Sequence, residues 1–346
     1  MSDLSHREAG SVHLSGPQRL GQEEHVALRI GAPVSLSGRH ARFGEQVELG
    51  LTTWRALDPS VELIIEDDRS EPGTLDVVLP RLAGQCDLLL GPYSTQLMRR
   101  AARLGAALNH LIWNHGGAGD DVQAARPGHV VSVLTPASRY AEPFIRHLVE
   151  IGDLSPLRIM YGKGGFARQV ADGAARAANE QGIPVVRGGP VEDSWNLLCA
   201  GSFDEDVAAV GRAGRSRVVC AVAAGVREFG TAVGDPRGVY GIAQWFPGLG
   251  GEPAVGISER DFLDAYRERA GRPPDYPAAQ AVAAAIIAAH CAERAGGTRR
   301  AELWPAAADL RTATLFGDFA IDPRTGAQTA HRTVLIRWES DGPVAV

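Results

Sequence analysis

The feature that most constrains the fold is a regular alternation of strand-like and helix-like segments between His25 and about Phe246. The strand-like runs are short and rich in Val, Ile and Leu, whereas the apolar residues between them recur at helical spacing, as Phe43, Val47 and Leu51 do. Such alternation is typical of parallel sheets that helices cover on both faces. We therefore expect an α/β fold built from doubly wound, mainly parallel sheets. The strand-like segments read HVALRIGA, VELIIEDD, CDLLLGP, HLIWN, HVVSVL, LRIMYG, IPVVRG, SRVVCAVAA and GVYGIAQWF.

The strand-helix units fall into two groups, which predicts two lobes. About four units precede Pro136, and a new series begins near Ser138. Three helical segments without a strong strand between them follow, and then a β-hairpin pattern with its turn at residues 322–326. Because helices so late in the chain must pack on a sheet that already exists, the chain must cross between the lobes more than once. We expect a first lobe of residues 25–136 and 247–313, and a second lobe of residues 137–246 and 314–346.

Composition excludes several functional classes. The chain has 346 residues, a formal net charge of -6 and a pI near 5.9, and it lacks the basic stripe that binds a phosphate backbone, so no nucleic-acid partner is expected. Its four cysteines lie far apart without a CxxC pair, which predicts buried small side chains rather than metal or redox chemistry. The stretch YPAAQAVAAAIIAAHCAERAGG is mainly alanine with polar interruptions, so no membrane insertion is expected. Neither a metal nor another cofactor is predicted.

The N-terminal segment predicts no export. It contains no charged region followed by an apolar region, and no cysteine for lipid attachment. As the sequence is written, we expect a cytoplasmic location. The few apolar side chains of residues 1–24 do not offset the entropy cost of ordering, so these residues are expected to form a flexible tail.

A junction at residues 88–105 carries hydroxyl groups where a ligand could bind. The segment LLLGPYSTQLMRRAARLG runs from an apolar strand through a Gly-Pro turn into an amphipathic helix, with Ser94 and Thr95 between them. A hydroxyl residue at a helix N-cap satisfies unpaired backbone N–H groups, which is a purely structural role. The same amides, beside a hydroxyl and the positive end of the helix dipole, also make a receptor for a carboxylate. The segment alone leaves both interpretations open.

The order and spacing of motifs along the chain resemble those of the type I periplasmic binding proteins. The motifs run from GAPVSLSGRHARFGEQVELG through DLLLGPYSTQ, LIWNHGGAGDD and YPAAQAVAAAIIAAH to GDFAIDPRTGAQ. They are most similar to the leucine/isoleucine/valine-binding branch, which serves ABC transporters of branched-chain amino acids and amides. The resemblance implies two lobes joined by a three-strand hinge, with a cleft that closes on a small polar ligand.

The resemblance also implies which residues contact that ligand. GPYST matches a family loop that offers a hydroxyl and helix amides to the ligand carboxylate. In the second lobe, Phe166 stands where many relatives carry a tyrosine. Amino-acid-binding relatives commonly place an acidic residue for the α-ammonium group around GIAQWFPG, and an amide such as Gln244 does not match that charge, which argues against a standard amino acid ligand. The candidate ligand-binding residues are Phe43, Tyr93, Ser94, Thr95, Asn114, His115, Gly116, Gly117, Phe166, Gln244 and Trp245.

Two residues at the start of the alanine-rich helix have a plain structural interpretation. Tyr276 and Gln280 could face the cleft, but packing in the core is the expected role for both. His115 is likewise expected to be a hydrogen-bonding loop residue, because no second ligand stands at metal-binding spacing.

An enzyme of another class is the competing hypothesis. The segment RIMYGKGGFARQ places Gly162, Gly164 and Ala167 after a strand in nearly the spacing of a dinucleotide fingerprint. The next strand ends in Arg187 instead of an acid, which only an NADP-dependent enzyme would accept. No Walker A loop, nucleophile elbow or HExxH motif is present, so no catalytic residues are assigned.

The expected function is therefore non-catalytic binding of a small polar organic ligand, namely an amino acid, an amide or a related carboxylate. The expected partner is the permease of an ABC transporter, and the resemblance implies a periplasmic or extracellular location for such a protein. A cytoplasmic sensor that signals to a regulatory partner is the alternative.

Overall fold

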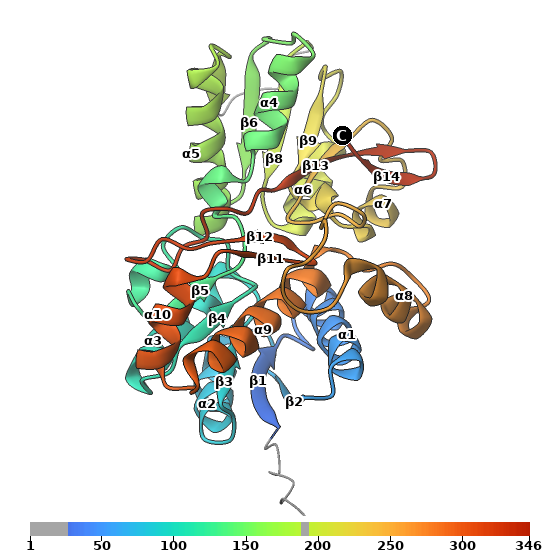
Figure 1. Ribbon diagram of the computed structural model, residues 1–346. Coiled ribbons are helices and arrows are strands. Elements are labelled where there is room, and N and C mark those ends of the chain that lie inside the picture. The colour runs from blue at the N-terminus through green and yellow to red at the C-terminus, as the bar shows by residue number, and fades with distance from the viewer. Residues whose placement is uncertain (1–26, 188–193) are drawn as a thin grey trace, which may run out of the picture.

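The first of two large sheets forms the centre of the lower lobe in Figure 1, a computed structural model that describes residues 27–187 and 194–346. Its strand order is β2-β1-β3-β4-β5, and every pairing is parallel. The expected tail at residues 1–24 lies outside the described residues. The strands are β1 (Leu28–Val34), β2 (Val61–Asp67), β3 (Leu88–Leu90), β4 (Ile112–Asn114) and β5 (Val130–Ser132).

Helices from both ends of the chain cover this first sheet. The alanine-rich helix α9 is buried along most of its length and packs against α1, β3 and β4. Close approach requires small residues, and a Cβ atom on Gly50 would lie 2.9 Å from the backbone of Ala278. Of the late helices, α9 thus packs on the first sheet, whereas α10 packs on α9 and α8 packs on α1. The helices are α1 (Ala41–Leu57), α2 (Pro72–Ala83), α3 (Thr95–Ala107), α8 (Glu259–Ala270), α9 (Tyr276–Ala295) and α10 (Arg300–Asp309).

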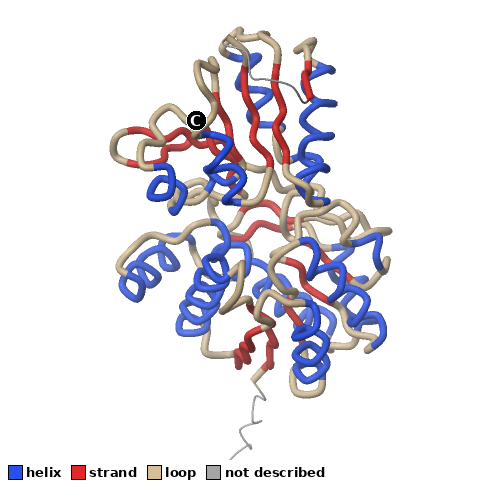
Figure 2. Tube along the Cα trace, turned by 180° about the vertical axis from the view of Figure 1, so that it is seen from behind, coloured by secondary structure: helices blue, strands red, loops and turns tan. Residues whose placement is uncertain are grey.

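The second sheet forms the upper lobe and is mixed at one edge. Its order is β14-β13-β10-β9-β8-β6-β7, in which β13 pairs antiparallel with both β10 and β14 and all other pairings are parallel. Viewed from behind, each lobe has its own group of strands with helices outside them (Figure 2). The strands are β6 (Leu157–Tyr161), β7 (Val185–Arg187), β8 (Asn196–Ala200), β9 (Val219–Ala221), β10 (Tyr240–Ala243), β13 (Val334–Glu339) and β14 (Gly342–Ala345), and the helices are α4 (Glu142–Glu150), α5 (Gly165–Glu180), α6 (Phe203–Val210) and α7 (Glu228–Val233).

The predicted C-terminal hairpin is only partly present. The turn at 322–326 forms, with the Asp322 carbonyl accepting from Gly326, and an isolated bridge joins Ile321 to Gln328. Its two arms, however, belong to different sheets. Strand β12 (Gly317–Phe319) pairs with β11 (Thr312–Thr314) between the lobes, whereas β13 pairs with β10 and β14. The turn therefore lies in a segment that passes from one lobe to the other, which local sequence pattern does not reveal.

Three chain segments, around Thr135, Gln244 and His331, cross between the lobes and form the hinge. Side-chain hydrogen bonds join these three segments to one another. The Gln244 side chain accepts from the Thr135 backbone N–H and donates to the Thr135 carbonyl, both at 3.0 Å. The Thr135 hydroxyl lies 2.7 Å from Nδ1 of His331, whose ring stacks on Phe316 with centroids 4.3 Å apart. Burial lowers the pKa of His331 to about 3, so this ring stays neutral. The two lobes and their hinge confirm the expected fold.

Candidate functional site

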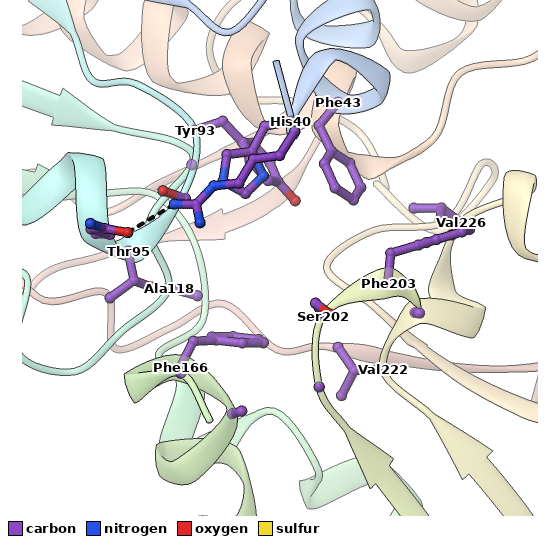
Figure 3. Close-up of a pocket in the computed structure, with 18 of the residues that line it drawn as sticks. His40, Phe43, Tyr93, Thr95, Ala118, Phe166, Ser202, Phe203, Val222 and Val226 are labelled. Carbon is purple, nitrogen blue, oxygen red and sulfur yellow. Dashed lines mark hydrogen bonds between the residues drawn. The ribbon is translucent and has the colours of Figure 1, made fainter. Parts of the chain in front are cut away.

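A cavity of about 750 Å³ lies between the two lobes and takes its walls from both. The first lobe contributes the start of α1, the turn before α3 and the start of α9. The second lobe contributes the starts of α5 and α6 and the segment after β9. Figure 3 shows aromatic and small apolar side chains around the open centre of this cavity. Of the predicted contacts, those that line it are Phe43, Tyr93, Ser94, Thr95, Gly116 and Phe166.

The turn before α3 divides the two possible hydroxyl roles between two residues. Ser94 is the N-cap, because its side chain accepts from the Leu97 backbone N–H at 3.3 Å. Thr95 is the first helical residue, and its Oγ1 accepts from the Gly119 backbone N–H at 3.0 Å. That bond uses a lone pair of the hydroxyl and leaves its hydrogen to donate. Thr95 is 8% exposed and lines the cavity, so it can donate to a ligand oxygen.

The loop after β4 shapes the turn more than it faces the cavity. Asn114 is fully buried, and its Nδ2 donates to the Gly117 carbonyl at 2.8 Å and to Ser132 Oγ at 2.7 Å. His115 is 1% exposed, and burial lowers its pKa to about 4. Gly117 lies against Met98, where a Cβ atom would come within 2.5 Å of the side chain. The structure therefore does not bring Asn114, His115 or Gly117 to the cavity.

The two predicted contacts after β10 lie in the hinge instead of the cavity. Gln244 is 1% exposed, and its side-chain amide is bonded to the backbone of Thr135 in the hinge. The Trp245 indole donates from Nε1 to the Leu315 carbonyl at 2.9 Å and is also buried. The absent acidic group at this position therefore carries no information about the ligand, because side chains here do not reach it.

Aromatic rings face the cavity from both lobes. Phe43 stacks on Tyr93 with ring centroids 4.5 Å apart and planes at 14°. In the second lobe, Phe166 meets Tyr140 edge to face, with centroids 5.3 Å apart. Offset stacks and edge-to-face pairs are favoured by the quadrupoles of the rings. These pairs hold two aromatic walls in fixed orientations.

Three tyrosine hydroxyl groups lie between these aromatic walls. Only Tyr93 was predicted from the sequence to contact the ligand, and Tyr140 and Tyr276 were not. Tyr93, Tyr140 and Tyr276 all line the cavity and exchange side-chain hydrogen bonds with Tyr276 in the middle. Burial raises the pKa of all three, so each hydroxyl keeps its proton, and two of the three protons serve the bonds among these phenols. Tyr276 and Gln280 were expected to pack in the core, whereas both line the cavity from the start of α9.

One arginine spans the cavity. Arg42 of α1 lies 3.6 Å from Asp204 and 3.5 Å from Glu228, both in the second lobe. Its guanidinium carbon also lies 4.1 Å from the centre of the Phe203 ring. These contacts exist only while the lobes are close together, so they favour the closed arrangement.

Two further arginines and a histidine complete the polar lining. Arg99 pairs with Asp121 at 2.9 Å, and Arg39 donates to Gln96 at 2.8 Å. Burial, with the nearby charges of Arg39 and Arg42, lowers the pKa of His40 to about 4. The histidine is therefore neutral near pH 7, and the guanidinium groups supply the positive charge.

A buried carboxyl group holds two second-lobe segments of the wall in place. Asp206 accepts from the Gly201 backbone N–H at 2.6 Å and from the Ala223 backbone N–H at 2.9 Å. Gly201 and Ala223 both line the cavity. No local sequence pattern distinguishes this aspartate from its neighbours Asp204 and Glu205, which are exposed.

The residues that suggested a dinucleotide-binding enzyme have other contacts in the structure. Arg187 pairs with Asp172 at 2.6 Å and donates to the Ala171 carbonyl at 3.2 Å. It is thus engaged on the neighbouring helix α5. Gly164 and Gly165 line the interlobe cavity at the start of that helix.

Three simpler expectations concern cysteines, metals and membranes. All four cysteines are buried and unpaired, as predicted. Within residues 27–187 and 194–346, no group of three or more His, Cys, Asp or Glu side chains is placed to hold a metal ion. Over the same ranges, no helix combines the length and the apolar character needed to cross a membrane.

Comparisons with known proteins agree with this architecture. Residues 201–343 match a family model described as periplasmic binding protein, and no curated protein matches the sequence. A leucine-binding protein LivK from Thermotoga maritima has a TM-score of 0.77 at 16% identity, with 92% of this chain and 97% of that chain covered. The branched-chain amino acid binding protein LivJ from Streptococcus pneumoniae, in complex with isoleucine, has a TM-score of 0.75 at 14% identity, with 92% and 99% covered.

A third solved structure differs in its ligand. A solute-binding protein of an ABC transporter from Rhodopseudomonas palustris, in complex with 3,4-dihydroxybenzoic acid, has a TM-score of 0.76 at 13% identity, with 92% of this chain and 95% of that chain covered. At such identities the likeness concerns the fold alone. With the family match, it confirms the resemblance drawn from the sequence: the chain has the fold of the type I periplasmic binding proteins and is similar to the substrate-binding proteins of branched-chain amino acid ABC transporters.

Proposed function

We propose that the chain is a non-catalytic receptor that binds a small organic carboxylate between its lobes and presents the closed form to the permease of an ABC transporter. The observation that carries the proposal is the 750 Å³ cavity, which is walled by both lobes and bridged by Arg42. A ligand that contacts both walls binds the closed form more tightly than the open one. Ligand binding in the cavity thereby shifts the protein toward its closed conformation.

The start of α3 is the proposed carboxylate receptor. The helix N-terminus offers backbone N–H groups and a positive dipole end, and Thr95 adds a hydroxyl hydrogen. Charge-assisted hydrogen bonds of this kind are stronger than neutral ones. Arg39 and Arg99 line the same wall. Arg39 adds positive charge because its side-chain partner Gln96 is neutral, whereas Arg99 is paired with Asp121.

The cavity hydroxyls of the two serines serve the backbone, which supports binding without turnover. Ser94 caps α3, and Ser202 caps α6 in a reciprocal pair with Glu205. Both hydroxyls thus accept a backbone N–H group of their own helix, which is a structural role. The proposal therefore assigns no catalytic residue.

Calorimetric titration tests the proposal with benzoate, L-leucine, L-isoleucine and acetamide as probes. At least one carboxylate should bind, and Thr95→Ala should weaken it by about 1.5–3 kcal/mol, the range for a hydrogen bond to a charged group. Thr95→Ser keeps the hydroxyl and is the matched control, with near-wild-type affinity expected. Binding should also reduce the radius of gyration in small-angle scattering. Failure of every carboxylate, or an unchanged affinity in Thr95→Ala, contradicts the proposed receptor.

A further inference from the structure

The cavity concentrates the aromatic side chains of the chain. The sequence contains nine Phe and six Tyr, and six of these fifteen line the cavity. They come from both lobes, and Figure 3 shows Phe43, Phe166 and Phe203 on different sides of its open centre. One stacked pair and one edge-to-face pair orient four of these six rings. A flat ring can therefore contact aromatic faces of both lobes at once.

The remaining apolar wall supports the same ligand shape. Ala118 and Leu134 lie on the first-lobe and hinge side, and Val222, Ala223 and Val226 lie on the second-lobe side. These side chains offer no hydrogen-bond donor or acceptor. A ligand that fills the centre of the cavity must accordingly be apolar over much of its surface.

No carboxylate of the cavity is placed to receive an ammonium group. Among the described residues that line it, the acids are Asp204 and Glu205, both in the exposed first turn of α6. Asp204 has a side chain 86% exposed and faces Arg42. Glu205 is engaged by the Ser202 backbone N–H at 2.8 Å. An α-ammonium group buried here would lose water without gaining an ionic partner, which is costly.

The charged groups of the lining instead favour an anion. Arg42 is already paired with Asp204 and Glu228, and Arg99 with Asp121. Arg39 donates to the neutral amide of Gln96, so its positive charge remains for a ligand carboxylate. Arg99 also reaches the second lobe, since a Cβ atom on Gly165 would lie 2.7 Å from its Nη2. An anion near Arg99 would therefore act on the contact between the lobes.

We infer that the ligand is an aromatic monocarboxylate of the benzoate or phenylacetate class, bound without an amino group. The inference rests on the proposed carboxylate receptor and adds the chemistry of the opposite end of the ligand. The carboxylate lies at the start of α3, and the ring lies between the aromatic walls of Phe43 and Phe166. An α-amino acid of the same size is disfavoured because its ammonium group has no buried carboxylate to meet.

Matched pairs of probes separate the parts of this inference by calorimetry. Phenylacetate and L-phenylglycine differ only by the α-ammonium group, and phenylacetate should bind at least ten-fold more tightly. Benzoate should likewise bind at least ten-fold more tightly than benzamide, which lacks the charge. Cyclohexanecarboxylate, which keeps the charge and loses the flat ring, should bind several-fold more weakly than benzoate.

Each contrary result identifies which step fails. Tighter binding of L-phenylglycine or L-leucine overturns the aromatic assignment and leaves the carboxylate receptor standing. Equal binding of benzamide overturns the assignment of an anion. Absence of binding by any of these carboxylates overturns the proposed function together with the inference.

Two variants test the walls independently of the choice of probe. Phe166→Leu should weaken benzoate several-fold and cyclohexanecarboxylate less, whereas Tyr161→Leu, an exposed aromatic outside the cavity, should change neither. Arg99→Gln should weaken benzoate and leave benzamide unchanged. Arg103→Gln, one turn further along the same helix and exposed, is its control. Equal losses for benzoate and cyclohexanecarboxylate in Phe166→Leu contradict the role of the ring.

Discussion

Asp206 should make the stability of this protein depend on pH in an unusual direction. Its carboxyl group is 1% exposed, and its only charged neighbours on α6 are other acids. Burial raises its pKa from 3.8 to about 7, although backbone N–H groups of Ala223 and Gly201 lower it in part. The folded protein therefore holds this proton more tightly than the unfolded chain does. Most carboxylates in ion pairs show the opposite behaviour.

The magnitude follows from the two pKa values. A group with a raised pKa in the folded state contributes stability that is complete below its unfolded pKa and is lost as pH rises through its folded pKa. For Asp206 this window runs from 3.8 to about 7. At about 1.4 kcal/mol for each unit, the loss across roughly three units is at most about 4 kcal/mol.

Denaturant unfolding of the wild type and of Asp206→Asn at pH values from 4 to 8 measures this loss. The variant cannot titrate at this position, and all other groups are shared, so their contributions cancel in the difference. The stability advantage of the wild type over the variant should fall from pH 4 to about pH 7 and then level off toward pH 8. Asparagine also turns one acceptor into a donor that opposes a backbone N–H, which lowers stability by about 1–3 kcal/mol at every pH. Parallel pH profiles of the two proteins would refute the reasoning.

Three further changes test other parts of the structure. Gly117→Ala should lower the free energy of unfolding by about 1–3 kcal/mol in denaturant titration, because the added Cβ atom would lie 2.5 Å from the Met98 side chain. Trp245→Phe leaves the buried Leu315 carbonyl without its donor and should cost about 1–3 kcal/mol, with benzoate affinity unchanged by calorimetry. Arg42→Gln removes a cation–π contact and two half-exposed ion pairs, together about 1–2 kcal/mol, and should increase the radius of gyration of the unliganded protein in small-angle scattering. An unchanged radius would show that Arg42 does not hold the lobes together.

The fold was largely accessible from the sequence because its determinants are periodic. Strand-helix alternation is local, and the late helices could be assigned to the first lobe because they had no strand of their own to cover. The prediction of a hairpin around residues 322–326 was only partly correct, because the sequence near a turn indicates the turn but not the strands with which its two arms pair. Here β12 pairs with β11 and β13 pairs with β10.

The candidate site was accessible where a residue is fixed by its own helix. Thr95 and Phe166 lie at helix starts that face the cavity, and the sequence marks such starts. Gln244 ends its strand in a similar way, but its orientation depends on Thr135, 109 positions earlier in the chain. Tyr276 reaches the cavity because α9 docks on the first sheet, a contact that no local pattern contains. Contacts between residues far apart in the sequence thus determine which side chains face the cavity, and the spacing of residues along the chain does not.

The side-chain bonds among the three chain crossings limit how the two lobes can move. Gln244 and His331 both attach to Thr135, so none of the crossings can bend without pulling on the others. The motion that costs least is one shared rotation, with little independent sliding or twisting of either lobe. Outer surfaces far from the cavity then take positions set by a single angle. A partner protein that contacts both lobes can then distinguish the closed form from the open form without contacting the ligand.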